Sequence, residues 1–310
     1  MSFQHLKYGA CLRSKRALAA LLVWACTGCA VSQKTKVKPS EAPRPAQTAT
    51  KAQLIDRYDD VARGVTSLNA TVTMKLTAGS AYSGVIEQYH EVNGFILAAR
   101  PASIRVIGQA PVVAKNIFDM VSDGKTFHIY IPSKNKFIEG PANFEKRADK
   151  PAENLRPQHL VDALFWPEIT ENSTVLFEEE NEAASRYYVL TVILQDEGSE
   201  PGATPARTRD WEVARKIWFD RADLSVSRVE IYDPQGEVSS DISYSDWQPA
   251  GTASYARQIA VARPADDYAL RIAITKLSVN EPVSPDRFVL AQPSGAEVVR
   301  VGEPSKEAQP

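Results

Sequence analysis

The sequence predicts a mainly β protein built on one antiparallel sheet, and three patterns support this fold class. Apolar and polar residues alternate with period two in roughly thirteen segments between residues 68 and 279, which is typical of half-buried strands. Helical patterns do not alternate with these strands, so the β–α–β order of a parallel sheet is not expected. All three cysteines lie at or before residue 29, so the folded part needs a core that is stable without disulfides.

Residues 1–28 have the pattern of a bacterial lipoprotein signal peptide. Four basic residues and no acidic residue precede the apolar run 17–25, which is shorter than the roughly 20 residues of a membrane span and fits a secretory signal. The small residues Thr27 and Gly28 stand directly before Cys29, in an order that resembles a lipobox. We therefore expect cleavage before Cys29 and lipidation of its side chain. The alternatives are secretion without lipid and a buried helix.

The chain after the signal peptide divides into a tether, one domain and a tail. Residues 29–51 contain few apolar side chains and several lysines and prolines, so they are expected to be a disordered tether. Residues 52–295 are expected to form a single domain, and residues 296–310 a flexible tail. Ala30 follows the cysteine, which resembles the sorting signal for the proteobacterial outer membrane. We expect a lipid-anchored protein of the bacterial cell envelope that faces the periplasm.

Two helices are expected within the domain. Residues 52–65 show apolar side chains at helical spacing opposite charged ones, which predicts a short amphipathic helix. A second helix is expected over residues 157–166, because Pro157 suits a first helical position and Pro167 stops the helix.

Turn residues divide the remaining segments into strands. Residues 68–77 alternate so regularly that this strand should have one buried and one solvated face. Asn93-Gly94 and Asp123-Gly124 are each predicted to form the turn of a β-hairpin.

The sequence gives little support for catalysis. The patterns H-E-x-x-H, G-x-x-x-x-G-K-[ST], G-x-G-x-x-G and G-x-S-x-G do not occur. The acidic residues at 178–182 point to alternate faces of a strand, so they cannot converge on one metal ion. A net charge of −2 gives no strong attraction for nucleic acid. We expect a protein that is not an enzyme and that has no cofactor, metal site or nucleic acid partner.

The pattern of elements suits binding better. A curved antiparallel sheet with helices over its concave face can enclose an apolar cavity. A carrier of acyl chains needs such a cavity, because exposing a chain to water costs about 0.8 kcal/mol per CH₂. The strand at 68–77 and the helix at 157–166 are the first candidates to line this cavity, or both are simply core.

Two segments resemble the LolA/LolB lipoprotein-carrier family. "GFILAARPASIRVIG" is similar to its arginine–proline segment, and "VSDGKTFHIYIPSKNKF" to the D-G hairpin that follows. The resemblance covers about residues 52–290, with the motifs in 94–137. It implies an incomplete, half-open and strongly curved β-barrel with a helical lid over a lipid cavity. Arg100 matches the arginine that helps to hold the lid shut, whereas Ile104 replaces a frequent aromatic residue. The exposed hairpin loop expected at 196–210 has no counterpart.

The resemblance and Cys29 together favour the membrane-anchored LolB type. We expect a periplasmic lipid- or lipoprotein-binding protein that acts in outer-membrane lipoprotein localisation or lipid transport. Its partners would be acyl chains, the membrane and an envelope carrier protein. The residues expected to line the cavity are Leu68, Ala70, Val72, Met74, Leu76, Phe95, Leu97, Ile104 and Val106. The residues expected to form the lid are Arg100, Leu160, Leu164, Phe165 and Trp166.

The alternative function is that of a structural envelope lipoprotein that serves as a protein–protein assembly module. A cavity through the domain would favour lipid binding. A filled core with an apolar outer patch would favour assembly.

Overall fold

The computed structural model describes residues 45–80, 85–144, 154–182, 185–195, 211–251 and 253–302. The predicted signal peptide, Cys29, most of the predicted tether and the loop at 196–210 lie outside these described residues.

The first described element is helix α2 (Lys51–Gly64), where the sequence predicts a helix over 52–65. Thr50 and Gln53 form a capping box at its N-terminus: the Gln53 N–H donates to the Thr50 hydroxyl at 3.3 Å, and the Thr50 N–H donates to the Gln53 side chain at 2.9 Å. The helix buries Leu54, Tyr58 and Ala62 on one side, in agreement with the predicted amphipathic pattern.

The strands follow the predicted alternation over most of the chain. They are β1 (Ser67–Ser80), β2 (Val85–Gln88), β3 (Val92–Ala99), β4 (Ser103–Gln109), β5 (Asn116–Ser122), β6 (Thr126–Ile131), β7 (Lys136–Pro141), β8 (Thr174–Glu182), β9 (Ser185–Gln195), β10 (Trp211–Asp220), β11 (Val226–Tyr232), β12 (Val238–Ala250), β13 (Ala253–Arg263), β14 (Tyr268–Val279) and β15 (Glu297–Arg300).

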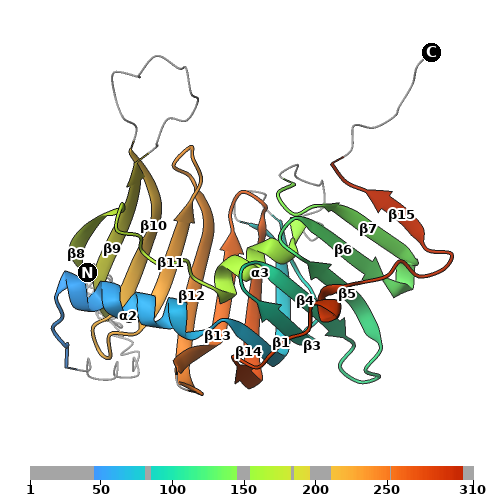
Figure 1. Ribbon diagram of the computed structural model, residues 1–310, viewed down its shortest axis with the longest axis horizontal. Helices are drawn as coiled ribbons and strands as arrows, with labels where there is room; N and C mark the ends of the chain where they lie inside the picture. The colour runs from blue at the N-terminus through green and yellow to red at the C-terminus, as the bar shows by residue number, and fades with distance from the viewer. Residues whose placement is uncertain are drawn as a thin grey trace, which may run out of the picture. The chain divides into compact units, whose positions relative to one another are not determined.

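All strands belong to one sheet, in the order β15-β7-β6-β5-β4-β3-β1-β14-β13-β12-β11-β10-β9-β8, with β2 paired to β1 (Figure 1). Every pair is antiparallel except β15 with β7. The path of paired strands ends at β15 and β8, which are not paired to each other in the part of the chain that the structure describes. The sheet is therefore curved but open. The predicted fold class, a single antiparallel sheet that does not close into a barrel, is confirmed.

A second helix, α3 (Pro157–Leu164), is inserted between β7 and β8. Figure 1 shows α2 and α3 in front of the same face of the sheet. Their buried apolar side chains belong to one core cluster with the side chains of that sheet face. Neither described helix has the length and apolar character needed to cross a bilayer.

The hairpin predicted at Asp123-Gly124 is confirmed. The turn lies between β5 and β6, and Gly124 has a φ of 87°, which an L side chain rarely adopts. The Asp123 carboxylate accepts hydrogen bonds of 2.8 Å from the backbone N–H groups of Thr126 and Lys125, and these bonds lower its pKa. The Asp side chain and the Gly backbone thus fix this turn together.

The hairpin predicted at Asn93-Gly94 is wrong, because both residues lie inside β3. A Cβ atom on Gly94 would come within 2.4 Å of the Ile107 carbonyl oxygen and 2.6 Å of the Met74 side chain. The glycine therefore permits close packing between neighbouring strands rather than a turn.

The C-terminal boundary predicted at residue 295 is also wrong. Residues Glu297–Arg300 form β15, which adds to the edge of β7 in parallel register. The Val301 N–H donates to the Glu139 carbonyl at 2.9 Å, and the Arg300 guanidinium lies 2.7 Å from the Glu139 carboxylate. Residues 303–310 of the predicted tail lie outside the described residues.

Candidate functional site

Helix α3 covers the inner face of the sheet. Leu160, Val161 and Leu164 on the helix are at most 4 % exposed, and the next two residues, Phe165 and Trp166, are each 5 % exposed. The sequence explains the position of the helix, because Pro157 begins it and its apolar side chains recur at helical spacing. The predicted lid residues of α3 therefore lie together over the core.

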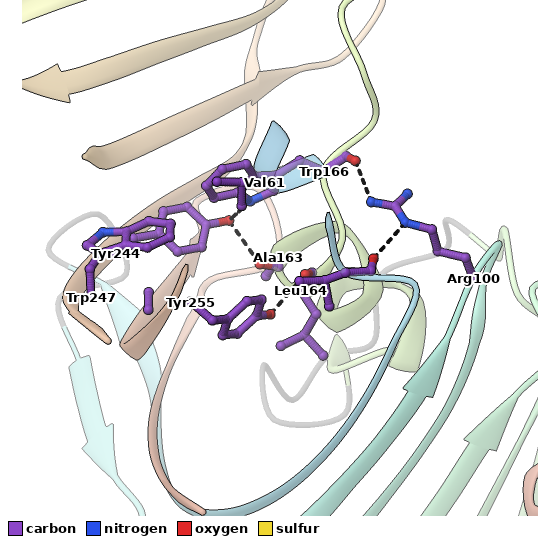
Figure 2. A pocket seen from close by; sticks show the side chains of 10 residues that line it. Val61, Arg100, Ala163, Leu164, Trp166, Tyr244, Trp247 and Tyr255 are labelled. Atoms are coloured by element: carbon purple, nitrogen blue, oxygen red, sulfur yellow. Dashed lines mark hydrogen bonds between the residues drawn. The ribbon is translucent and has the colours of Figure 1, made fainter. Parts of the chain in front are cut away.

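The C-terminal end of α3 is held by side chains of the sheet (Figure 2). The Tyr244 hydroxyl donates to the Ala163 carbonyl at 2.9 Å, and the Tyr255 hydroxyl donates to the Leu164 carbonyl at 2.9 Å. Carbonyl groups in the last turn of a helix lack partners within the helix, so these tyrosines satisfy groups that would otherwise be buried without hydrogen bonds. Burial raises the pKa of both tyrosine hydroxyls, which keeps them protonated as donors.

Arg100 joins the two helical segments. Its Nη2 atom donates to the carbonyls of Ala62 at 2.6 Å and Trp166 at 2.8 Å, and its Nε atom donates to the Val65 carbonyl at 3.1 Å. The guanidinium also lies 5.2 Å from the centre of the Phe165 ring. Partial burial lowers the pKa of Arg100. One charged side chain thus links the end of α2 to the segment that follows α3.

Trp166 is the centre of an aromatic cluster. Its ring stacks on Tyr58 at 5.1 Å between centroids and meets Tyr244 at 5.0 Å and Trp247 at 5.9 Å in edge contacts. The indole N–H donates to the Tyr244 hydroxyl at 2.7 Å. The cluster occupies the space between α2, the residues after α3, and the strand β12.

The space between the aromatic cluster and Arg100 is almost completely filled. The cavity that Figure 2 shows, between the aromatic cluster and Arg100, has a volume of about 10 Å³. This volume holds about one water molecule and no acyl chain. This part of the interior is therefore packed and leaves no room for the expected acyl chain.

Most residues expected to line the cavity lie in that core. Side chains of β1 and β4 point inward and are buried, with Leu76 partly buried against the same cluster. The buried members are Leu68, Ala70, Val72, Met74, Ile104 and Val106.

Phe95 and Leu97 are exceptions, because they point to the other face of the sheet, where Leu97 is nevertheless buried. In the register of β1 with β3, Phe95 lies opposite Thr71 and Leu97 opposite Asn69, on the polar face of β1. Phe95 is 43 % exposed. The inward side chains of β3 are those of Ile96 and Ala98, which lie in the core. Successive residues of a strand point to opposite faces, so Phe95 and Leu97 point outward.

The N-terminal end of α3 is held by a different kind of contact. The His159 Nδ1 atom lies 2.7 Å from the Tyr268 hydroxyl of β14. Burial, and to a smaller extent the charge of Arg263, lower the pKa of His159 to about 3, although the charge of Asp266 opposes the shift. His159 is therefore neutral near pH 7.

The segment after α3 continues along α2 through polar contacts. The Ile169 N–H donates to the Asp59 carboxylate at 2.9 Å, and the Glu168 carboxylate lies 3.1 Å from the Arg63 guanidinium. The Pro167 carbonyl accepts a hydrogen bond of 2.9 Å from Arg215. Residues 166–169 therefore form a strap bound to both α2 and the sheet.

Sequence reasoning missed the tyrosines and Arg215 of this site. Tyr244 is two residues after Ile242 on β12 and therefore shares its face, so its inward direction could be predicted from the period-two pattern. Its hydrogen-bond partner, the Ala163 carbonyl of α3, could not be predicted, because the two residues are 81 positions apart in the sequence. Within the described ranges, no group of three His, Cys, Asp or Glu side chains could hold a metal ion.

No protein-family model matches the sequence, and no curated protein matches it. Among solved structures, the chain is similar to a LolA superfamily protein from Nitrosomonas europaea, with 11 % identity, a TM-score of 0.45, and coverage of 78 % of this chain and 99 % of that one. It is similar to a DUF1329 family protein from Desulfovibrio piger, with 14 % identity, a TM-score of 0.46, and coverage of 76 % and 94 %. A structure from Vibrio parahaemolyticus, described as an outer membrane lipoprotein-sorting protein domain, has 13 % identity, a TM-score of 0.46 and the same coverage.

Proposed function

We propose that the protein binds acyl chains of lipids or lipoproteins between the sheet and α3, after α3 and the strap move away from the sheet and carry Trp166 out of the aromatic cluster. The observation that carries this proposal is the independence of the lid from the sheet. Helix α3 has eight residues and supplies no strand to the sheet, whose order is continuous without it. The lid can therefore leave while every pair of strands remains intact.

The surface beneath the lid suits an acyl chain. It consists of the inward side chains of β1, β3 and β4, which are aliphatic and almost completely buried. An acyl chain that replaced the lid would restore much of the burial that opening removes, at about 25 cal/mol per Å² of apolar surface. Binding and lid movement would then be coupled.

The test is uptake of a dansyl-labelled undecanoic acid, together with native mass spectrometry of the full chain. Arg100→Gln removes the three hydrogen bonds by which Arg100 links the strap to the end of α2, so we expect tighter binding of the probe than in the wild type. Arg271→Gln, on the exposed face of β14, is the matched control and should bind like the wild type. A folded Arg100→Gln variant that binds no probe would contradict the proposal.

The proposal includes a lipid anchor at Cys29, which places the domain at the outer membrane facing the periplasm. Cys29→Ser should abolish labelling of the expressed protein by radioactive palmitate in bacterial cells. Equal labelling of the variant and the wild type would rule out this anchor.

One observation favours assembly as a second function. The core is filled, and the outer face near the ends of β8 and β10 exposes Leu176 by 48 % and Trp211 by 56 %. An envelope protein could dock on this apolar surface. If neither the wild type nor Arg100→Gln takes up the probe, assembly becomes the better account, and Trp211→Ser should then weaken co-purification of an envelope partner.

A further inference from the structure

The strap is bound at two consecutive carbonyl groups by arginines from different parts of the sheet. Arg100, which follows β3, donates to the Trp166 carbonyl at 2.8 Å. Arg215, on β10, donates to the Pro167 carbonyl at 2.9 Å. In the order of strands, β3 and β10 lie on opposite sides of β1. The two peptide groups on either side of Pro167 are therefore each held by one arginine, from opposite sides of β1.

Arg215 also acts on the aromatic cluster. Its Nη1 atom donates to the Tyr58 hydroxyl at 3.1 Å, and its guanidinium lies 6.0 Å from the centre of the Tyr58 ring. Tyr58 in turn stacks on Trp166. Arg215 thus contacts both the backbone beside Trp166 and the ring that covers one face of its indole.

An irregularity in β10 accounts for the direction of this side chain. The pairing of β10 with β9 shifts between Val213 and Arg215, so that Val213 faces Ile193 and Arg215 faces Val192. A β-bulge of this kind leaves one residue unpaired and redirects the side chains that follow. Here it places Arg215 on the inner face, beside Tyr58 and the strap.

A bond to the Pro167 carbonyl does more than complete the C-terminal turn of α3. The helix ends at Leu164, three residues earlier, and the tyrosines already satisfy its last carbonyls. Proline has no N–H group, so the carbonyl is the only backbone hydrogen-bonding group that Pro167 offers.

We propose that Arg215 is a positioning residue of the lid, which with Arg100 keeps the Trp166 ring in the space that an acyl chain would occupy. This inference rests on the proposed lipid binding only for the identity of the occupant. The position of the Trp166 ring can be measured without lipid, so the two proposals can fail separately.

The experiment is ¹⁹F NMR of the full chain, in which all five tryptophans are replaced by 5-fluorotryptophan. The Trp166→Phe variant identifies the signal of Trp166. Arg215→Gln should raise the population of a second, solvent-like Trp166 signal about tenfold, as expected for the loss of a charged hydrogen bond. Arg228→Gln is the matched control, because Arg228 lies 4.9 Å from the ring of a different tryptophan, Trp218. It should change the Trp218 signal and leave that of Trp166 unchanged.

Arg215→Lys keeps the charge and a donor but loses the guanidinium Nη1 atom that donates to both the Tyr58 hydroxyl and the Pro167 carbonyl, so we expect an intermediate Trp166 signal. A Trp166 signal identical to the wild type in Arg215→Gln overturns the proposal. If Arg215→Gln does not fold, the Arg215→Lys spectrum decides: an unchanged Trp166 signal overturns the proposal, and an increased second signal supports it. Titration with the dansyl probe comes afterwards. A mobile Trp166 ring without any probe binding would support Arg215 as a positioning residue and contradict lipid binding.

Discussion

The two ends of α3 are attached to the sheet by different chemistry. At the C-terminal end, Arg100, Tyr244 and Tyr255 donate to backbone carbonyls, and all three keep their protons throughout the neutral and mildly acidic range. At the N-terminal end, the contact between His159 and Tyr268 depends on a histidine that is neutral because it is buried. These three contacts at the C-terminal end therefore do not titrate in this range, whereas the His159 contact at the N-terminal end does.

The direction of the acid effect follows from the pKa of His159. Its pKa is about 3 in the folded protein, below the value of about 6.5 in an unfolded chain. The unfolded state therefore binds more protons than the folded state at mildly acidic pH. The contribution of His159 is fully present above about pH 6.5 and is lost as the pH falls toward 3.

Arg100→Gln should cause the largest loss at the C-terminal end. The substitution removes three hydrogen bonds to backbone carbonyls, so we expect the free energy of unfolding to fall by about 3 kcal/mol, at about 1 kcal/mol per bond. Urea unfolding should give the same difference from the wild type at pH 7.5 and pH 5.5. A difference that changes with pH would contradict the assignment of the Arg100 contacts as insensitive to acid.

Two tyrosine variants separate the bonds within the same end. Tyr244→Phe removes one bond accepted from Trp166 and one donated to Ala163, so it should lower the free energy of unfolding by about 2 kcal/mol. Tyr255→Phe removes a single bond to Leu164 and should cost about 1 kcal/mol. Equal losses in thermal or urea unfolding would show that the Trp166 bond contributes nothing.

His159→Gln tests the acid-sensitive end. The wild type should lose about 1.4 kcal/mol through His159 between pH 7.5 and pH 5.5, whereas glutamine does not titrate. The difference in unfolding free energy between the two proteins should therefore shrink by this amount over that range. A constant difference would mean that the histidine is already protonated, or accessible to water, in the folded protein.

Asn154→Ala should have a small effect, equal in size to that of Tyr255→Phe. The buried Asn154 amide donates to the Asp266 carbonyl at 3.1 Å, near the N-terminal end of α3, and it does not titrate. We expect a loss of about 1 kcal/mol that is equal at both pH values. This result would show that only the His159 contact, and not the Asn154 contact, makes the stability of the N-terminal end depend on pH.

The fold was predictable where the sequence showed a single clear pattern, such as uninterrupted alternation of apolar and polar residues. Residues 68–77 alternate without interruption, and β1 buries the predicted side chains. In β3, three apolar residues stand in a row from Phe95 to Leu97, so alternation could not decide which face points inward. Asn93-Gly94 has the composition of a turn, but its glycine is required by close contact with a neighbouring strand. That requirement exists only once the strands are paired.

The candidate site was predictable only in part, for a related reason. Prolines and apolar spacing located α3 from its own sequence. The groups that hold it come from β10, β12 and β13, and the direction of Arg215 depends on a β-bulge. Local patterns do not report which distant side chains meet a helix end.

The position of β1 has a consequence for how the chain folds. Strands β3–β7 and β8–β14 are each ordered as in the sequence, so each group can form by successive local pairing. β1 joins the two groups, and its pairing of Leu68 with Val279 connects residues about 200 positions apart. Contacts of such large sequence separation form slowly. During folding, β1 therefore stays paired on one side only until β14, near the end of the chain, pairs with its other side.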